Sequence, residues 1–168
     1  LHWVSDLLLA EKAVRVAALG LLDDSNVSKD GLPLLVKAVF GKGSIQEQQQ
    51  LLAQLPKLSK DKTLPVLQGL IEQAKAQKLP PDLNLEFREA IEASGDASLK
   101  AAFDGLKPQA SLMEQYAEVL HGGNSSNGWG LFFYNATAQC GRCHAIGTEG
   151  GKVGPNLSSI GKTLTRAQ

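Results

Sequence analysis

A short leucine–proline phrase occurs twice in the first half of the chain, and its spacing constrains the fold more than any other feature. Leu-Pro-Leu-Leu at residues 32–35 returns as Leu-Pro-Val-Leu at residues 64–67. Each phrase opens a segment whose apolar residues recur at three- and four-residue steps, the period of one face of an α-helix. Proline fits near a helix start because the N–H groups of the first turn have no partner inside the helix. Both phrases therefore predict the beginning of a helix.

A second helix is predicted before each of these, over residues 13–22 and 45–55. Ser44 and Glu47 have the spacing of a capping box at the start of the later one. A third pair of helices is predicted over residues 83–103, with Asp96 as the N-cap of its second member. Paired helices that recur about every thirty residues are typical of a helical repeat array, in which neighbouring units stack into an α-solenoid. An irregular all-helical bundle is the alternative.

The composition changes near Lys107 and Pro108. Leucine-rich helical sequence precedes this point, and after a further predicted helix over residues 111–120, ten of the 17 glycines lie from Gly122 onward. Asn124 or Ser125 is expected to cap one more helix there. The glycine-rich segment either wraps closely around a bulky group or forms a flexible tail. We therefore expect an all-α chain with two domains, over residues 1–108 and 109–168.

The overall charge and composition exclude several classes of function. The 17 basic and 17 acidic residues give a formal charge of zero, whereas nucleic-acid binding needs a basic surplus. No apolar run reaches membrane-spanning length. No nucleophile–base grouping, paired carboxylates or phosphate-binding loop stands out, so we expect no catalytic site and no enzyme activity. The chain begins at Leu1 without a methionine or a signal peptide, which favours a segment of a longer protein.

The two cysteines of the chain, Cys140 and Cys143, are followed directly by His144. In c-type haem attachment, two cysteines at this spacing form thioethers with the haem vinyl groups, and the adjacent histidine coordinates the iron. A structural zinc site needs four ligands, and the other histidines, His2 and His121, lie at no recognised spacing. A redox dithiol needs a βαβ setting, and a disulfide here would close almost no loop. The motif therefore predicts a haem c site, with a chance match as the alternative.

The surrounding sequence resembles a class I cytochrome c domain. Residues 128–144, GWGLFFYNATAQCGRCH, are similar to its opening, where a glycine and an aromatic pair precede the CxxCH motif. Residues 150–161, GGKVGPNLSSIG, resemble its haem-edge loop, in which Gly154, Pro155 and Leu157 match the conserved turn. The resemblance implies that the carbonyl of Pro155 accepts a hydrogen bond from His144, which a metal-ligating histidine generally needs.

The order of features along nearly the whole chain resembles a wider family. It is similar to the C-terminal region of secreted bacterial haem-binding proteins of the membrane-bound-dehydrogenase type, with HEAT-like helical repeats, an LPPDL phrase at residues 79–83 and a truncated cytochrome c domain. The resemblance implies covalent haem c that passes electrons from a dehydrogenase domain elsewhere in the parent protein to a redox acceptor. It also implies a periplasmic or secreted location. The alternative is a helical-repeat interaction scaffold whose CxxCH motif is unoccupied.

One part of the class I pattern is missing from the sequence. The family places a methionine, the sixth iron ligand, well after the CxxCH motif, but the 24 residues that follow His144 contain none. The single methionine, Met113, lies in an apolar helical pattern and is expected to pack in the core. A lone histidine such as His121 is seldom a ligand. We expect the sixth ligand to lie outside the chain or to be absent.

The properties of the haem site are expected to depend on its axial histidine and on the apolar residues that cover the haem. Phe132, Phe133 and Ile146 are expected to bury the haem. Residues 109–168 contain three acidic residues (Glu114, Glu118 and Glu149) and four basic residues (Arg142, Lys152, Lys162 and Arg166). This near balance predicts no strong electrostatic steering of a partner.

Overall fold

The computed structural model describes residues 11–106 and 111–168 and divides the chain into two compact units after Gly122. We call the part up to Gly122 the helical unit and residues 123–168 the C-terminal unit. The expected boundary between residues 108 and 109 lies outside the described residues. The segment 111–122 belongs to the helical unit, where the guanidinium of Arg88 lies over the ring of Tyr116 at 5.8 Å.

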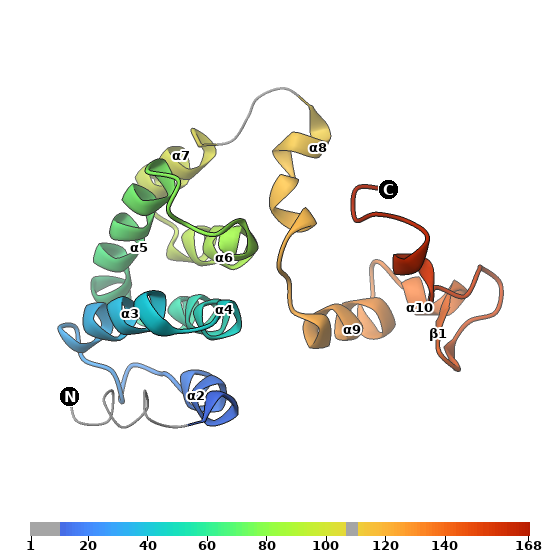
Figure 1. Ribbon diagram of the computed structural model, residues 1–168, viewed down its shortest axis with the longest axis horizontal. Coiled ribbons are helices and arrows are strands. Elements are labelled where there is room, and N and C mark those ends of the chain that lie inside the picture. The colour runs from blue at the N-terminus through green and yellow to red at the C-terminus, as the bar shows by residue number, and fades with distance from the viewer. Residues whose placement is uncertain (1–10, 107–110) are drawn as a thin grey trace. The chain divides into compact units, whose positions relative to one another are not determined.

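The helical unit is built from α-helices joined by short 3₁₀ turns (Figure 1). The α-helices are α2 (Lys12–Leu19), α3 (Gly31–Lys42), α4 (Ile45–Gln54), α5 (Lys60–Lys75), α6 (Asn84–Ser94), α7 (Ala97–Asp104) and α8 (Leu112–Gln115). The 3₁₀ turns are η1 (Leu55–Lys57), η2 (Pro81–Leu83) and η3 (Ala117–Leu120). Alternate helices stack in two layers, with α2, α4 and α6 in one layer and α3, α5 and α7 in the other (Figure 1).

The two leucine–proline phrases take different places in their helices. Pro33 lies in the first turn of α3, as predicted. The second helix, α5, begins earlier than its phrase, so Pro65 lies inside it and the predicted start was wrong. Ser59 sets this earlier start: its backbone is extended, and its N–H donates to the carboxylate of Asp24 at 2.8 Å.

The predicted caps are present. Glu47 accepts hydrogen bonds from the backbone N–H of Ser44 at 2.8 Å and from its hydroxyl at 2.7 Å, which completes the capping box of α4. Asp96 accepts from the N–H of Leu99 at 2.9 Å and caps α7. Gly95, with φ of 65°, supplies the left-handed residue that ends α6. Local signals therefore fix these helix ends.

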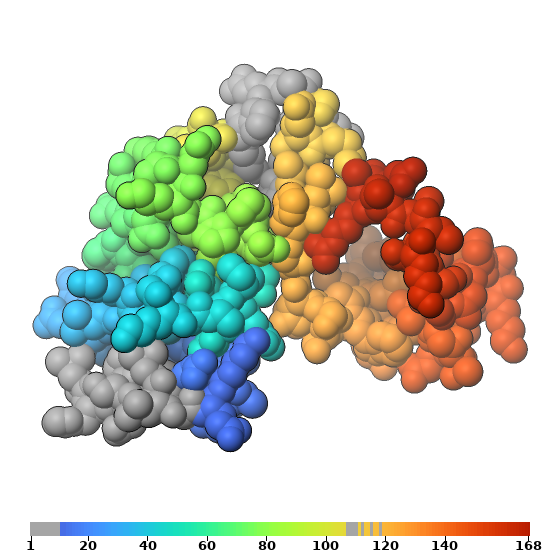
Figure 2. Space-filling view, viewed as in Figure 1, coloured from blue at the N-terminus to red at the C-terminus, as the bar shows by residue number. Residues whose placement is uncertain are grey.

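The core of the helical unit lies between its two layers. On the face that Figure 2 shows, the side chains of α4 and α6 adjoin at the surface (cyan and light green). Leu83, Phe87, Ala90 and Ile91, whose three- and four-residue spacing predicts one face of a helix, are fully buried. The rings of Phe87 and Phe103 meet edge to face with centroids 5.5 Å apart. This packing accounts for the stacking of α6 against α7. In the part of the chain that the structure describes, no helix is both long and apolar enough to cross a membrane.

An ion pair joins α2 to α4. The guanidinium of Arg15 donates to the carboxylate of Glu47, whose side chain is almost fully buried. This hydrogen bond, helped by those from Ser44, lowers the pKa of Glu47 to about 2 in spite of the opposing effect of burial. The same carboxylate therefore caps α4 and holds α2, the next helix of the same layer, against it.

A second buried carboxylate, that of Glu86, has no ion pair of this kind in the described part of the chain. Glu86 on α6 is 6% exposed, and its Oε2 atom has no hydrogen-bond partner among the described residues. Burial raises the pKa of Glu86, and the nearby carboxylates of Glu89 and Asp82 raise it further, against a hydrogen bond from Gln49. Charge at Glu86 is therefore unfavourable in the folded helical unit.

Met113 does not pack in the core as expected. It is 49% exposed. The helix expected over residues 111–120 is interrupted at Tyr116, which leaves α8 and the 3₁₀ turn η3 in its place. A helix as short as α8 offers too little continuous face to bury the side chain.

The C-terminal unit contains one regular helix, one short helix and a small hairpin. Its elements are α9 (Ser125–Tyr134), α10 (Cys140–Cys143), β1 (Ala145–Ile146), β2 (Glu149–Gly150) and the 3₁₀ turn η4 (Ile160–Lys162). Asn124 caps α9, as predicted, by accepting from the N–H of Asn127 at 3.0 Å. The strands pair antiparallel, with Ala145 opposite Gly150. Apart from this hairpin the described chain is all-α, which confirms the predicted class.

Candidate functional site

The two cysteines lie on a single turn of helix. Cys140 is the first residue of α10 and Cys143 is the last, so both side chains lie on the same helix face. Both thiols are free, and the cysteines are half-buried and exposed respectively. The turn therefore offers two thiols that a single planar group can approach from one side.

The segment before α10 is held by its own side chains. Asn135 accepts hydrogen bonds from the N–H groups of Thr137 at 2.9 Å and Ala138 at 2.8 Å, which closes a turn after α9. Gln139 then adopts a left-handed backbone with φ of 48°, uncommon for a residue with a side chain. Its amide group donates to the carbonyl of Ala136 at 2.6 Å and accepts from Arg142 at 2.6 Å. These bonds fix the entry into the CxxCH turn.

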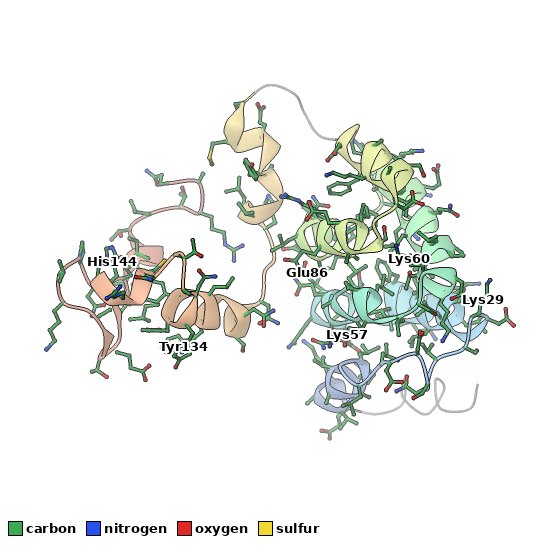
Figure 3. The ribbon with its side chains drawn as sticks, turned by 180° about the vertical axis from the view of Figure 1, so that it is seen from behind. Lys29, Lys57, Lys60, Glu86, Tyr134 and His144 are labelled. Carbon is green, nitrogen blue, oxygen red and sulfur yellow. The ribbon has the colours of Figure 1, made fainter. Side chains whose placement is uncertain are left out.

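His144 directly follows α10 as its C-cap residue (Figure 3). Its Nδ1 atom lies 2.9 Å from the carbonyl oxygen of Pro155, so the hydrogen bond implied by the resemblance is present. A carbonyl oxygen only accepts, so Nδ1 carries the proton and Nε2 keeps its lone pair. Within the described residues Nε2 has no hydrogen-bond partner. The imidazole is thus in the tautomer that a metal ligand requires.

The glycine-rich run wraps around the CxxCH turn and is not a loose tail. Gly151 donates its N–H to the carbonyl of Gly141 at 2.9 Å, and Gly154 donates to the carbonyl of Cys143 at 2.7 Å. A Cβ atom on Gly154 would lie 2.6 Å from Cε1 of His144, so the bare backbone packs directly on the imidazole. Any side chain at Gly154 would displace the ring.

Aromatic residues of α9 also pack on the turn. A Cβ atom on Gly141, the residue after the first cysteine, would lie 2.8 Å from Cδ1 of Phe133. The ring of Phe133 in turn contacts those of Trp129 and Phe132, with centroids 4.5 and 4.8 Å away. Sequence analysis did not single out Gly141, although a glycine inside the CxxC segment was a visible signal of close packing.

The C-terminal unit lacks an apolar interior of its own. Ala145 is its one buried apolar residue among those described. Phe132, Phe133 and Ile146, the residues expected to cover a haem, are half-buried, whereas Trp129 and Tyr134 are 39% and 78% exposed. So little buried surface gives a unit of this size little stability of its own. Its apolar side chains therefore present a surface that a large apolar group would cover.

The donor set fits a haem better than a bare metal ion. Across residues 11–106 and 111–168, no three His, Cys, Asp or Glu side chains gather to hold a metal ion. A haem brings its own four nitrogens and needs from the protein only thiols and an axial nitrogen, which Cys140, Cys143 and His144 supply. His121 is exposed and belongs to the helical unit.

Comparison of the chain with protein-family models, with curated proteins and with solved structures gave no match. The functional assignment therefore depends on the residues and the geometry of the site.

Proposed function

We propose that the chain is a c-type haem-binding electron-transfer module attached to a HEAT-like helical repeat array. Cys140 and Cys143 hold the haem covalently, and Nε2 of His144 coordinates its iron. The observation that carries this proposal is the 2.9 Å contact between Nδ1 of His144 and the carbonyl of Pro155, next to two free thiols on one helical turn.

Each residue of the site has a role in this proposal. The Pro155 carbonyl fixes the orientation of the imidazole and increases its basicity, as partners of metal-bound histidines do. Gly154 permits this contact because it has no side chain to push the ring away. The partly exposed aromatic side chains of α9 give the haem an apolar surface to pack on. Haem when bound supplies reversible one-electron chemistry.

The helical unit supports the rest of the proposal. Alternate helices stack in two layers, the arrangement that a solenoid of helical repeats would give. We expect electrons to come from a dehydrogenase domain elsewhere in the parent protein and to pass to a separate acceptor. Covalent haem attachment takes place outside the cytoplasm, so the expected location is periplasmic or secreted.

A groove in the helical unit favours a second candidate function, that of a protein-interaction scaffold. The groove lies between α3 and α5, has a volume of about 410 Å³ and is lined mainly by Pro33, Val36, Phe40, Pro65 and Leu70. Helical stacks commonly bind partners on such surfaces. In this case the CxxCH turn has no haem, and binding to the helical unit does not depend on Cys140 or Cys143.

The deciding experiment is expression of the chain in a bacterial periplasm with haem c maturation machinery, followed by a reduced pyridine-haemochrome spectrum. We expect the α-band of haem held by two thioethers, and its loss in the Cys140→Ala/Cys143→Ala variant. The Gly161→Ala variant is the matched control, because nothing lies within 4 Å of a Cβ atom there. A folded chain, helical by circular dichroism, that takes up no haem would overturn the proposal and favour the scaffold.

A further inference from the structure

The groove between α3 and α5 is built from equivalent positions of the two leucine–proline repeats. Its lining includes Pro33, Lys37 and Gly41 of α3, and Pro65, Gly69 and Gln73 of α5. Within each helix these residues follow one another at four-residue steps, so they form a ridge along the helix surface. The second ridge repeats the first at the shift that separates the two phrases. The repeat therefore places two matching ridges on neighbouring helices of one layer (Figure 1).

The floor of this groove is apolar and well packed. Val36, Val66 and Leu70 line it, and all three are buried residues of the main core. The helices α3 and α5 also pack against α4 and α6 of the second layer, which holds them in place. The groove is therefore a preformed apolar surface on a side of the layer that the second layer does not cover.

The two glycines in the ridges have no packing reason within the described chain. Gly69 lies inside α5, and Gly41 lies in the last turn of α3. Glycine weakens a helix relative to alanine. A Cβ atom at either position would meet nothing within 4 Å, so a side chain would be tolerated there. Glycine at these two points keeps the ridges low, which lets the backbone of a partner approach closely.

Lys37 supplies the charge of the groove. It is the one charged residue in the lining, and it is exposed. Among the described residues it forms no ion pair, whereas Lys62 and Lys75 are paired with carboxylates. An unpaired ammonium group beside an apolar floor favours a partner with a carboxylate at the matching position.

The walls of the groove favour a helical partner over an extended one. The backbone N–H and C=O groups of α3 and α5 are hydrogen-bonded within their own helices, so the groove offers no strand edge to an extended peptide. A helix needs no such edge, because its own backbone groups are satisfied. Grooves with apolar floors bind amphipathic helices through side chains on one helix face.

We infer that the groove between α3 and α5 binds an amphipathic helix of a partner protein, with a carboxylate of that helix paired to Lys37. The apolar face of the helix lies on Val36, Val66 and Leu70, and its backbone passes closest at Gly41 and Gly69. The inference does not rest on the proposed haem function. It names the class of partner that the scaffold function leaves open.

The test is a ¹H–¹⁵N NMR titration of the full haem-free chain with two synthetic helical peptides. Each has about 15 residues, with leucine at three- and four-residue steps on one face. One carries a glutamate beside the leucine stripe, and the other a lysine at the same place. We expect shift changes at the amides around Gly41 and Gly69, and about threefold tighter binding of the glutamate peptide. Lys37→Glu should reverse the order of the two affinities, which a general loss of structure cannot do.

Substitutions at Gly69 separate binding from stability. Gly69→Ala should raise the Tm of the free chain, because alanine favours the helix, and should still weaken binding of the glutamate peptide. Gly69→Leu fills the groove and should weaken binding by about tenfold or more, since the peptide then meets an added side chain. The control is Ala93→Leu, which adds a side chain of the same size at an exposed position of α6 and should leave binding unchanged.

Three outcomes would overturn the inference. These are no shift change with either peptide at about 1 mM, equal affinity of the wild type and Gly69→Leu, or a dimer of the free chain that Gly69→Leu abolishes, which would assign the groove to a second copy. Cys140→Ala/Cys143→Ala should bind the glutamate peptide as the wild type does. Loss of peptide binding with an intact haemochrome spectrum would therefore refute this inference alone, and peptide binding by a chain that never takes up haem would refute only the haem function.

Discussion

The Nδ1 atom of His144 lies 2.9 Å from the carbonyl oxygen of Pro155, across eleven residues of chain. The intervening glycines make this possible, because Gly154 presents backbone and no side chain to the imidazole ring. The contact therefore requires glycine at position 154, because the side chain of any other residue would meet the imidazole ring.

Gly154→Ala should displace the imidazole of His144. The new Cβ atom would lie 2.6 Å from Cε1 and 2.7 Å from Nδ1, so the ring must move and its bond to Pro155 weakens. Overpacking of this kind costs about 1–3 kcal/mol. We expect a lower haem content per chain and a lower Tm of the loaded protein, measured against Gly161→Ala, which has open space around its Cβ position. Equal haem content in both variants would contradict the role given to Gly154.

Exchange of His144 for alanine should change the iron coordination without breaking the thioethers. Haem remains attached through Cys140 and Cys143, but the absorption spectrum of the ferrous protein should lose the features of an axial histidine. His121→Ala is the control, since this exposed histidine lies in the helical unit. If His121→Ala changes the spectrum as His144→Ala does, the single-histidine assignment is wrong.

Glu47→Gln should destabilise the helical unit above pH 5. Its pKa is lowered from 4.5 to about 2, chiefly by the hydrogen bond from Arg15, so its contribution is complete above pH 4.5 and is lost as the pH falls toward 2. Loss of hydrogen bonds to a charged group costs about 2 kcal/mol. Urea unfolding should show a larger difference from wild type at pH 7 than at pH 3, where part of the contribution is already lost.

The matched control for this prediction is Glu72→Gln. Glu72 pairs with Lys75 on the exposed face of α5, where an ion pair contributes about 0.5 kcal/mol or less. A similar loss of stability in both variants would mean that burial of the Arg15–Glu47 pair has no special effect.

Glu86→Gln should have the opposite effect on stability. Burial raises the pKa of Glu86 above the ordinary value of 4.5, so the folded protein favours the protonated form. Stability is therefore lost as the pH rises from 4.5 to the raised pKa, and the full cost is present above it. The amide keeps the shape and removes the charge, so Tm should rise at pH 7 and match wild type near pH 4. Glu92→Gln on the same helix, which breaks an exposed pair with Arg88, should not raise Tm at either pH.

Without haem, the C-terminal unit should be the less stable part of the chain. It buries one alanine among its described apolar residues, whereas α4 and α6 are packed in the main core. Amides of α9 should exchange with solvent far faster than those of α6, and haem attachment should slow them by about tenfold or more. Equal protection of α9 and α6 in the haem-free chain would contradict the argument that the unit lacks an interior.

Local features of the fold were predictable from the sequence because they depend on near neighbours. The caps at Ser44, Asp96 and Asn124 satisfy N–H groups three residues away, and the stripe around Phe87 follows from helical period alone. The bond between His144 and Pro155 was expected only through family resemblance. No spacing rule joins residues eleven positions apart.

The remaining features depend on contacts that no local pattern records. Pro65 lies inside α5 because Asp24, far away in sequence, fixes the start at Ser59. Tyr116 contacts Arg88 in the helical unit, and the boundary lies after Gly122, beyond Glu114 and Glu118. The C-terminal unit therefore has four basic residues and one acidic residue, and is less balanced in charge than predicted. Met113 is exposed because its helix is shorter than its apolar pattern suggests.

The N–H groups of Gly151 and Gly154 donate hydrogen bonds to the CxxCH turn. Lys152 and Val153 lie between these two glycines in the sequence. Both bonds use backbone atoms, so the two side chains between them take no part in holding the turn. Residues at these two positions can therefore be exchanged during evolution, or by an engineer, without loosening the turn itself. A chain built in this way can acquire a new recognition specificity while the chemistry next to it is inherited unchanged.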